Sequence, residues 1–240
     1  MSGRTPDAAV FAVNHQDWED VTFLHWDYDV DVVQGLLPSP LRAQSWEGRS
    51  FVGVTPFRMA RVRLPWMPAI PQWRAFPELN IRTYVTGPGG RDGIWFLGMV
   101  VSRRSFATVL RMLGLPYLTS DSDVSRLGNA VNYRFGAPGL AGSGSGDWFT
   151  ATTHFGAALP EDERTSLIDS LTGRWSAFHR RAGLLWRTPV EHEPWPLYRA
   201  SVVGSLTAPL RWVGLPEPEG PPLVHASPGV HTRLGSLRPA

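Results

Sequence analysis

The 240-residue chain contains neither cysteine nor lysine. Without cysteine it can form no disulfide, no thiolate site for zinc or an iron–sulfur cluster, and no cysteine nucleophile. All 23 residues counted as lysine or arginine are therefore arginine. Arginine stays protonated in proteins and cannot supply the neutral amine that attacks a carbonyl carbon to form an imine. The sequence thus excludes covalent catalysis by a thiolate or by a lysine amine.

Long hydrophobic runs and dense runs of charge are also missing. The longest apolar stretch, residues 93–101, suits a buried strand but is too short to span a membrane. The apolar run at residues 8–13 is shorter than a signal-peptide core, and polar residues follow it. The formal net charge is only +2, and the arginines at 58–63 and 103–104 form no dense basic tract. These absences favour a cytoplasmic protein that binds neither membranes nor nucleic acid.

Glycine and proline are frequent, with 24 and 22 residues spread along the chain. Such spacing is typical of many short strands joined by turns. With the chain length, it favours one β-rich domain over residues 1–240. Strands are predicted at residues 42–46, 50–60, 76–86, 93–102, 131–137, 147–155, 184–192, 197–205, 222–226 and 230–234. Pro88-Gly89-Gly90 predicts a turn that joins two of these strands, 76–86 and 93–102, in a hairpin.

Few helices are expected. Short helices are predicted at residues 29–37 and 104–113, each followed by a proline or glycine that ends it. A third is predicted from residue 160 to about residue 181, because acids lie at its start and arginines at its end. Apolar residues recur within it at helical spacing, namely Leu167, Leu171, Trp175 and Phe178. The glycine- and serine-rich segment 139–146 predicts a flexible hairpin loop.

The segment 76–85 predicts a strand with two contrasting faces, since side chains alternate along a strand. The apolar face carries Leu79, Ile81, Thr83 and Val85, and the polar face carries Glu78, Asn80, Arg82 and Tyr84. If the polar face meets solvent, this is an ordinary amphipathic strand. If it lines a barrel interior, Glu78 and Arg82 could pair there and orient a substrate. The pattern alone leaves both environments open.

Five short motifs, in order along nearly the whole chain, resemble the uncharacterised YqjF-like family. They are Phe23-Leu24-His25-Trp26, the segment 76–85, the segment 93–97, the segment 111–117 and the segment 190–197. This family looks like a branch of the acetoacetate decarboxylase-like superfamily. The resemblance implies a β-rich α+β fold, in which a large antiparallel sheet rolls into a cone-like, partly open barrel with a few flanking helices. It also implies that the polar face carrying Glu78 points into a central pocket.

The chain departs from the decarboxylases at the reactive amine. Those enzymes place a reactive lysine just after a Phe-Pro pair, with a second lysine beside it. The matching stretch here is Gly114-Leu115-Pro116-Tyr117-Leu118, so Tyr117 and Leu118 stand where the two lysines would be. The resemblance thus implies an inherited pocket, with Glu78 matching an acidic active-site residue. Imine-based decarboxylation by a lysine is excluded.

These observations predict a site for a small carbonyl or carboxylate compound. Glu78, Arg82 and Tyr117 are the predicted catalytic residues, because a guanidinium binds anions and a carboxyl group in an apolar cavity can transfer a proton. The predicted substrate-binding residues are Asn80, Tyr84, His25, Trp26, Arg111, His192 and Trp195. Three functions stay open. The first is a lysine-independent lyase, isomerase or hydratase, the second is a non-catalytic binding or accessory protein, and the third is an oligomeric scaffold.

No motif for a cofactor or metal is present. The chain has no glycine-rich phosphate loop and no dinucleotide fingerprint, and its histidines show no compact ligand spacing. We therefore expect neither a cofactor nor a metal ion. The apolar segment 64–73 is interpreted either as a lid over the pocket or as a contact in a homo-oligomer.

Overall fold

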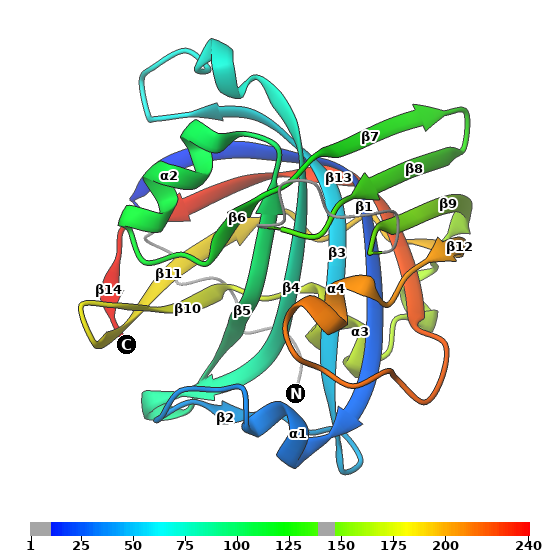
Figure 1. The fold of residues 1–240 in the computed structure, drawn as a ribbon, viewed down its shortest axis with the longest axis horizontal. Coiled ribbons are helices and arrows are strands. Elements are labelled where there is room, and N and C mark those ends of the chain that lie inside the picture. Colours follow the sequence, from blue (N-terminus) through cyan, green and yellow to red (C-terminus); the bar gives the residue numbers. More distant parts are fainter. Residues whose placement is uncertain (1–10, 139–146) are drawn as a thin grey trace.

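A computed structural model describes residues 11–138 and 147–240, so the loop predicted at residues 139–146 lies outside the described residues. Within the described ranges a 14-stranded sheet dominates (Figure 1). Its strands are β1 (Ala12–Asp29), β2 (Arg42–Ala43), β3 (Arg49–Arg63), β4 (Ala75–Gly87), β5 (Arg91–Val101), β6 (Tyr117–Thr119), β7 (Ser122–Leu127), β8 (Ala130–Phe135), β9 (Phe149–Ala158), β10 (Ser176–Arg181), β11 (Leu184–His192), β12 (Tyr198–Ser205), β13 (Leu223–Gly235) and β14 (Arg238–Pro239). The α-helices are α1 (Val30–Gln34), α2 (Arg104–Met112), α3 (Ser166–Thr172) and α4 (Ala208–Trp212).

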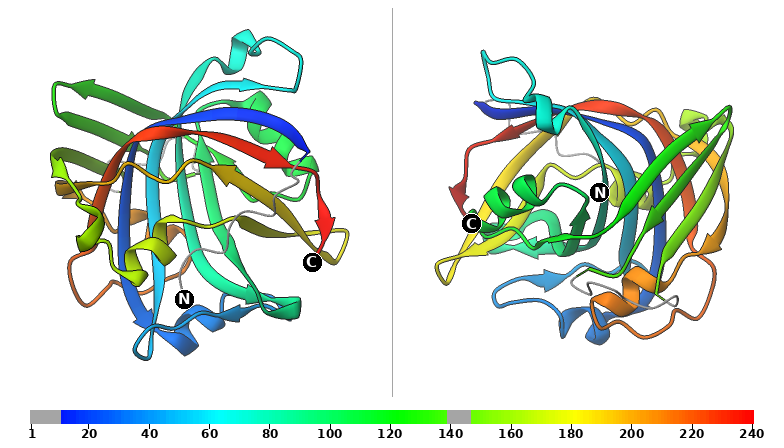
Figure 2. Two further views of the ribbon diagram at one scale, coloured as in Figure 1. Left: turned by 180° about the vertical axis from the view of Figure 1, so that it is seen from behind. Right: turned by 45° about the horizontal axis from the view of Figure 1, so that its top comes forward.

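The sheet closes into a ring, which confirms the predicted rolled sheet (Figure 2). Strands β11, β10, β5, β4, β3, β1 and β13 follow one another, and β11 pairs back to β13 from Val190–Leu234 to His192–Thr232. The predicted antiparallel sheet is mixed, because β5 pairs in parallel with β6 and with β10. Parallel neighbours need a crossover connection, and α2 supplies the one between β5 and β6.

Strands β12, β9, β8 and β7 continue the sheet beyond β13 as a wing on the right of Figure 1. The wing packs against the outward side chains of the ring in one apolar cluster. The ring contributes Leu24, Trp26, Val54, Leu79 and Ile81, and the wing contributes Tyr133, Phe135, Phe149 and Ala151. The apolar face of β4 is therefore buried beneath the wing, which leaves its other face toward the interior of the ring.

The longest strand, β1, was not predicted from the sequence. It begins with a polar stretch at residues 14–20, whose acids and histidine hide its strand character. In the structure β1 pairs along most of its length with β3 on one side and β13 on the other. Pairing with two neighbours, and not intrinsic propensity, makes this segment a strand.

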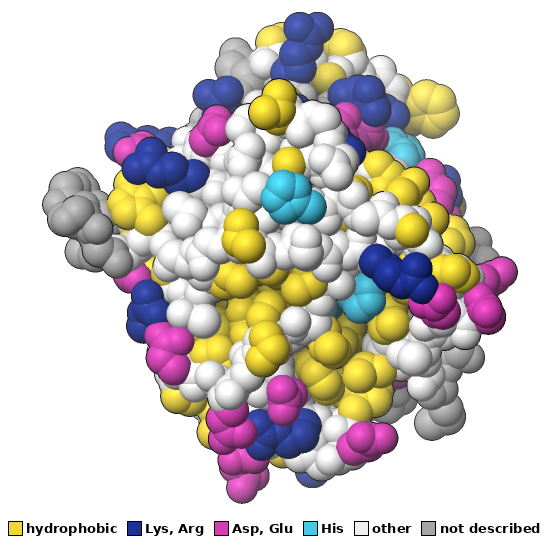
Figure 3. Space-filling model, turned by 90° about the vertical axis from the view of Figure 1, so that its right-hand side faces the viewer, with side chains coloured by type: hydrophobic (Ala, Val, Ile, Leu, Met, Phe, Trp, Pro, Cys, Tyr) yellow, Lys and Arg dark blue, Asp and Glu magenta, His cyan; other side chains and the backbone are white. Residues whose placement is uncertain are grey.

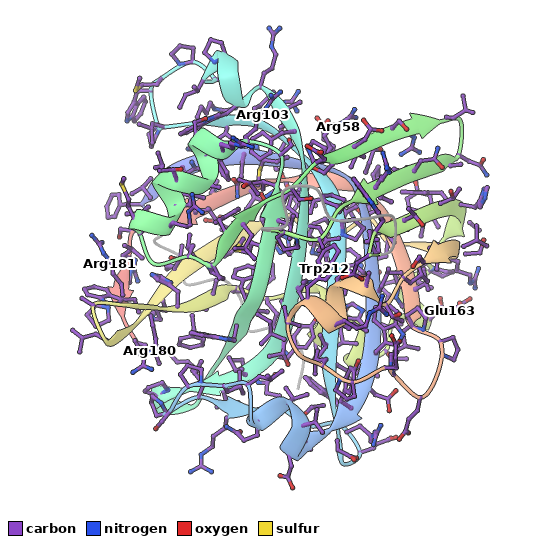
Figure 4. The ribbon with its side chains drawn as sticks, in the orientation of Figure 1. Arg58, Arg103, Glu163, Arg180, Arg181 and Trp212 are labelled. Carbon is purple, nitrogen blue, oxygen red and sulfur yellow. The ribbon has the colours of Figure 1, made fainter. Side chains whose placement is uncertain are left out.

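The third predicted helix, from residue 160 to about residue 181, is observed as α-helix only over Ser166–Thr172, after a 3₁₀ turn at Glu161–Glu163. Helix α3 ends before Gly173, and residues 176–181 form β10. The Phe178 ring packs closely over Gly87 and Gly93. A Cβ atom on Gly87 would lie 2.5 Å from the ring, and one on Gly93 would lie 2.7 Å from it. Tertiary pairing with β5 and β11 therefore overrides the helical spacing. The arginines predicted at a helix end, Arg180 and Arg181, instead lie at the edge of the molecule (Figure 4).

The described helices include none that is long and apolar enough to cross a membrane. Isolated apolar side chains do reach the surface, for example Val203 on β12 and Leu127 on β7. Figure 3 shows the side of the molecule that carries the wing, where hydrophobic side chains lie among charged ones. Scattered exposure of this kind is ordinary for a folded protein.

Gly229 is required where β13 pairs with β1, opposite Glu19. Its φ angle is 133°, and a Cβ atom there would lie 2.0 Å from the Trp18 carbonyl oxygen. Gly229→Ala is therefore expected to lower the free energy of unfolding by roughly 1–3 kcal/mol from backbone strain, with a further loss from the clash. Urea denaturation measures this, with Gly220→Ala as the control because no atom lies within 4 Å of its added methyl group. Equal stability losses in the two variants would contradict the argument.

Candidate functional site

The ring holds a cavity of about 610 Å³, within the range of roughly 300–1,000 Å³ typical of small-molecule sites. Most of its wall is apolar, with residues that include Trp18, Met59, Trp73, Phe96, Met99, Phe106, Leu110, Leu113 and Leu115. Polar side chains are fewer, and they come from β1, β4, β6, β10, β11, the end of α3 and the segments that follow α3 and β13. A mostly apolar cavity with a small set of convergent polar groups is the usual form of a ligand site.

The polar face of β4 lines this cavity. Glu78, Asn80 and Arg82 all contribute to the wall, and they are only 1%, 3% and 4% exposed. Of the two environments that the sequence leaves open, the inward one is observed. The cause is the register of β4 between β3 and β5, together with the wing that covers the opposite face. Tyr84 continues the same row, but it lies behind the wall and not in the lining.

Glu78 and Tyr117 form a buried hydrogen-bonded pair. The Tyr117 hydroxyl donates to Oε1 of Glu78 at 3.1 Å, while Oε2 has no partner among the described residues. Burial raises the pKa of Glu78 to about 8, although hydrogen bonds from Tyr117 and Asn80 lower it. Burial and the Glu78 carboxyl group also raise the pKa of Tyr117 well above its usual value. Glu78 is therefore mostly protonated at neutral pH and close to the range in which it can accept or donate a proton.

Arg82 is a buried cation with no anionic partner among the described residues. Its Nη2 donates to the Leu171 carbonyl oxygen at 3.2 Å, and its Nε has no hydrogen-bond partner among the described residues. Within the described ranges no carboxylate oxygen lies within 4.0 Å of this guanidinium, so the pairing with Glu78 considered from the sequence is not formed. An unpaired buried charge is costly, and a bound anion would relieve that cost.

Arg174 is a second cation in the wall, and sequence reasoning missed it. Its Nη2 donates to Oε1 of Gln44 at 2.7 Å, and Nη1 lies 3.9 Å from the Asp92 carboxylate, but Nε has no partner in the described part of the chain. Burial lowers the pKa of Arg174. The residue lies in the segment mistaken for helix, so the strand alternation that revealed Arg82 gave no signal here.

Two histidines also line the cavity. His192 Nδ1 lies 2.6 Å from the Glu193 carbonyl oxygen, which can only accept, so Nδ1 carries the hydrogen. Burial lowers the pKa of His192, which keeps the ring neutral and leaves Nε2 as an acceptor. His179 was not predicted. Both of its ring nitrogens are buried without a partner among the described residues, and burial lowers its pKa.

His25, Tyr84 and Trp195 support the site from behind. Tyr84 donates to the Leu171 carbonyl oxygen at 2.7 Å and accepts from His25 Nε2 at 2.6 Å. The same carbonyl accepts from Arg82, so this layer orients the guanidinium. Trp195 donates from Nε1 to the Thr172 carbonyl oxygen at 3.0 Å and packs beside His192, with ring centroids 5.0 Å apart. These three residues lie outside the cavity lining.

The predicted ligand contacts of Trp26 and Arg111 are corrected. Trp26 follows His25 on β1 and so points to the opposite face, where it packs under the wing. Arg111 is exposed on α2, and its Nη2 lies 3.2 Å from the Thr108 hydroxyl oxygen. The cavity side of α2 carries Phe106, Val109 and Leu110, which turns Arg111 toward solvent. Leu64 and Trp73 of the segment 64–73 line the cavity, and Trp66 and Met67 are exposed.

Comparison with known proteins places this architecture in a family. The model of DUF2071, described as an uncharacterized conserved protein, matches residues 15–231. The chain belongs to this family. A relative, the uncharacterized protein YqjF of Bacillus subtilis (strain 168), is 31% identical over 214 residues, which cover 89% of this chain and 86% of the relative. The predicted YqjF-like resemblance is confirmed.

Solved structures share the fold at low sequence identity. An acetoacetate decarboxylase-like enzyme from Sphingomonas wittichii RW1 is 14% identical, with a TM-score of 0.62 and coverage of 96% of this chain and 94% of that chain. The enduracididine biosynthesis enzyme MppR, complexed with pyruvate, is 13% identical, with a TM-score of 0.66 and coverage of 97% and 92%. At these identities the likeness shows the fold, which is the predicted acetoacetate decarboxylase-like one.

Proposed function

We propose that this protein binds a small carbonyl or carboxylate compound in its cavity and transfers a proton to or from it through Glu78. The observation that carries the proposal is that two buried groups line one cavity: a carboxyl group with a raised pKa, and a guanidinium with no carboxylate partner among the described residues. The fold supports the same ligand class, since MppR is solved in complex with pyruvate, a carbonyl acid. With no lysine in the chain, the chemistry proceeds without a lysine imine.

Each polar residue takes a role that its surroundings suit. Arg82 and Arg174 bind the carboxylate, because a guanidinium presents several donors to an anion. The ionised form of Glu78 removes a proton from the carbon beside the carbonyl group, so that the C–H bond breaks and an O–H bond forms on Glu78. The nearby guanidinium groups stabilise the negative charge that develops on the carbonyl oxygen. Tyr117 holds the carboxyl group of Glu78 in place by its hydrogen bond.

Binding without turnover is the second candidate function. The Tyr117 hydroxyl already occupies Oε1 of Glu78, and such a pair can serve simply to satisfy a buried carboxyl group. In that case Glu78→Gln leaves ligand affinity largely unchanged and there is no reaction to lose. A single measurement of proton transfer separates the two candidates.

Exchange of carbon-bound protons with deuterium tests the proposal. We expect the protein to speed the exchange of the C3 protons of pyruvate or 2-oxobutanoate in D₂O near pD 8, followed by proton NMR. Glu78→Gln should slow this by roughly 100- to 10,000-fold, the usual contribution of a general acid or base. Glu47→Gln, at an exposed glutamate, is the control. A thermal shift with these acids reports binding separately.

The outcomes separate cleanly. Binding with no accelerated exchange identifies a binding protein. If the protein neither binds a keto acid nor speeds its exchange, the proposal is overturned.

A further inference from the structure

Besides its polar groups, the cavity wall presents a large apolar surface. Helix α2 contributes only apolar side chains to the lining: Phe106, Val109, Leu110 and, just beyond its end, Leu113. Strand β5 adds Ile94, Phe96 and Met99, which are apolar as well. A three-carbon acid held at Arg82 would leave most of the roughly 610 Å³ of the cavity unfilled. The unfilled part faces α2.

A continuous path of aromatic rings leads from Glu78 to the surface. Tyr117, whose hydroxyl contacts Glu78, packs its ring edge-on against Phe106 with centroids 5.4 Å apart. Phe106 packs in the same way against Trp73, with centroids 5.2 Å apart. Trp73 lies at the end of the apolar segment 64–73, whose first residue, Leu64, also lines the cavity. The apolar wall therefore runs without a break from the acid–base group to the opening.

The opening is mostly apolar, and Ser236 is an exposed polar residue of the lining. Val13, Leu64 and Val109 all line the cavity, yet they are 45%, 46% and 44% exposed, so the cavity meets solvent between β1, the segment 64–73 and α2. Apolar side chains at a cavity mouth lose contact with water when an apolar ligand group covers them. A ligand with a polar end inside and an apolar body toward the mouth would bury these side chains.

We infer that the ligand is an amphiphilic carbonyl acid, whose carboxylate binds Arg82 and Arg174 and whose extended apolar body lies along α2 toward the mouth formed by Val13, Leu64 and Val109. This inference rests on the proposed function, which assigns the carboxylate end of the ligand. It adds the size and polarity of the remainder of the molecule. The reaction at Glu78 is unchanged, because the apolar body takes no part in it.

A series of 2-oxo acids of increasing chain length tests the inference. We expect Kd to fall about fourfold for each added methylene, from pyruvate through 2-oxohexanoate to 2-oxodecanoate, until the cavity is filled. Isothermal titration calorimetry measures each Kd. An affinity that is flat or falls with chain length would overturn the inference. If such acids still bind in an Arg82-dependent manner, the proposed function stands; if no acid binds, the proposed function fails as well.

A matched pair of variants locates the apolar body. Val109→Trp narrows the mouth from α2, whereas Val32→Trp makes the same change on α1, where Val32 is 37% exposed and outside the cavity lining. Val109→Trp should weaken binding of the longest acids by roughly tenfold or more, equal to about two methylene groups left unburied. Pyruvate binding should stay within about twofold, and Val32→Trp should change neither. Equal losses for short and long acids would contradict the placement.

A second pair decides the matter if Val109→Trp folds poorly. Leu64→Asp puts a charge at the mouth, where Leu64 is 46% exposed. Leu223→Asp is the control, because Leu223 is similarly exposed at 42% and lies outside the cavity lining. Leu64→Asp should selectively weaken binding of the long-chain acids, because a charged group cannot cover an apolar body. Unchanged selectivity for chain length in Leu64→Asp would overturn the inference.

Discussion

Replacing Glu78 with glutamine is expected to raise the free energy of unfolding, relative to wild type, more at high pH than at low pH. The difference between variant and wild type at pH 8 and above should exceed the difference at pH 4 by on the order of 5 kcal/mol. Burial raises the pKa of Glu78 from 4.5 to about 8, and each pKa unit corresponds to about 1.4 kcal/mol. Between these two values the unfolded chain releases the proton of Glu78 while the folded protein keeps it. Wild-type stability therefore falls as pH rises from 4.5 to 8 and then levels off.

Urea denaturation across this pH range measures the effect, because glutamine does not titrate. The two stability curves should converge at low pH and separate toward pH 8, the pKa of the folded state. Glu47→Gln, which removes an exposed carboxylate, serves as the control. Parallel curves for wild type and Glu78→Gln would show that the folded protein does not hold this carboxyl group in its neutral form.

Arg82→Leu is expected to have two opposite effects. Affinity for carboxylate ligands should fall by roughly 10- to 150-fold, the value of hydrogen bonds to a charged group. The free energy of unfolding should rise or stay level, because an apolar side chain replaces a buried cation that has no partner anion in the described part of the chain. Titration calorimetry and urea denaturation measure the two quantities on the same samples. Arg181→Leu, at the edge of the molecule in Figure 4, is the control.

A neutral ketone of the same length sharpens this test. Its affinity should be nearly the same in wild type and in Arg82→Leu, because it carries no carboxylate for the guanidinium. A large loss of ketone binding would mean that the substitution disturbs the shape of the cavity. Weaker carboxylate binding together with lower stability would count against an uncompensated charge at this position.

The row of polar residues on β4 could be predicted because alternation along a strand needs only local sequence. Its inward direction could not, because it depends on the wing, which covers the other face of β4 and is built from residues more distant in the chain. Arg174 and His179 were missed for a related reason. They lie on either side of the start of β10, where helical spacing of apolar residues masked a strand that forms only by pairing with β5 and β11.

Neighbouring residues in a motif need not share a role. His25 and Trp26 are adjacent in a motif, yet they point to opposite faces of β1, and only His25 touches the layer behind the cavity. Arg111 shares a motif with Tyr117, but it lies on the solvent side of α2. Sequence resemblance identifies such segments, whereas the choice of side chain requires the direction of each strand and helix.

The uneven lengths of the strand pairings divide the cavity wall into a fixed part and a yielding part. Strand β4, with Glu78 and Arg82, is clamped along most of its length by β3 and β5. The β10–β11 hairpin, which carries His179 and His192, has only short pairings with the other described strands. They join it to β5 at Ala177–Ile94 and Phe178–Trp95, to β13 over Val190–His192, and to β14 at Trp186–Pro239 and Arg187–Arg238. Short ladders open at lower cost than long ones. A larger ligand would thus be accommodated by outward movement of the β10–β11 hairpin, while Glu78 and Arg82 keep their spacing.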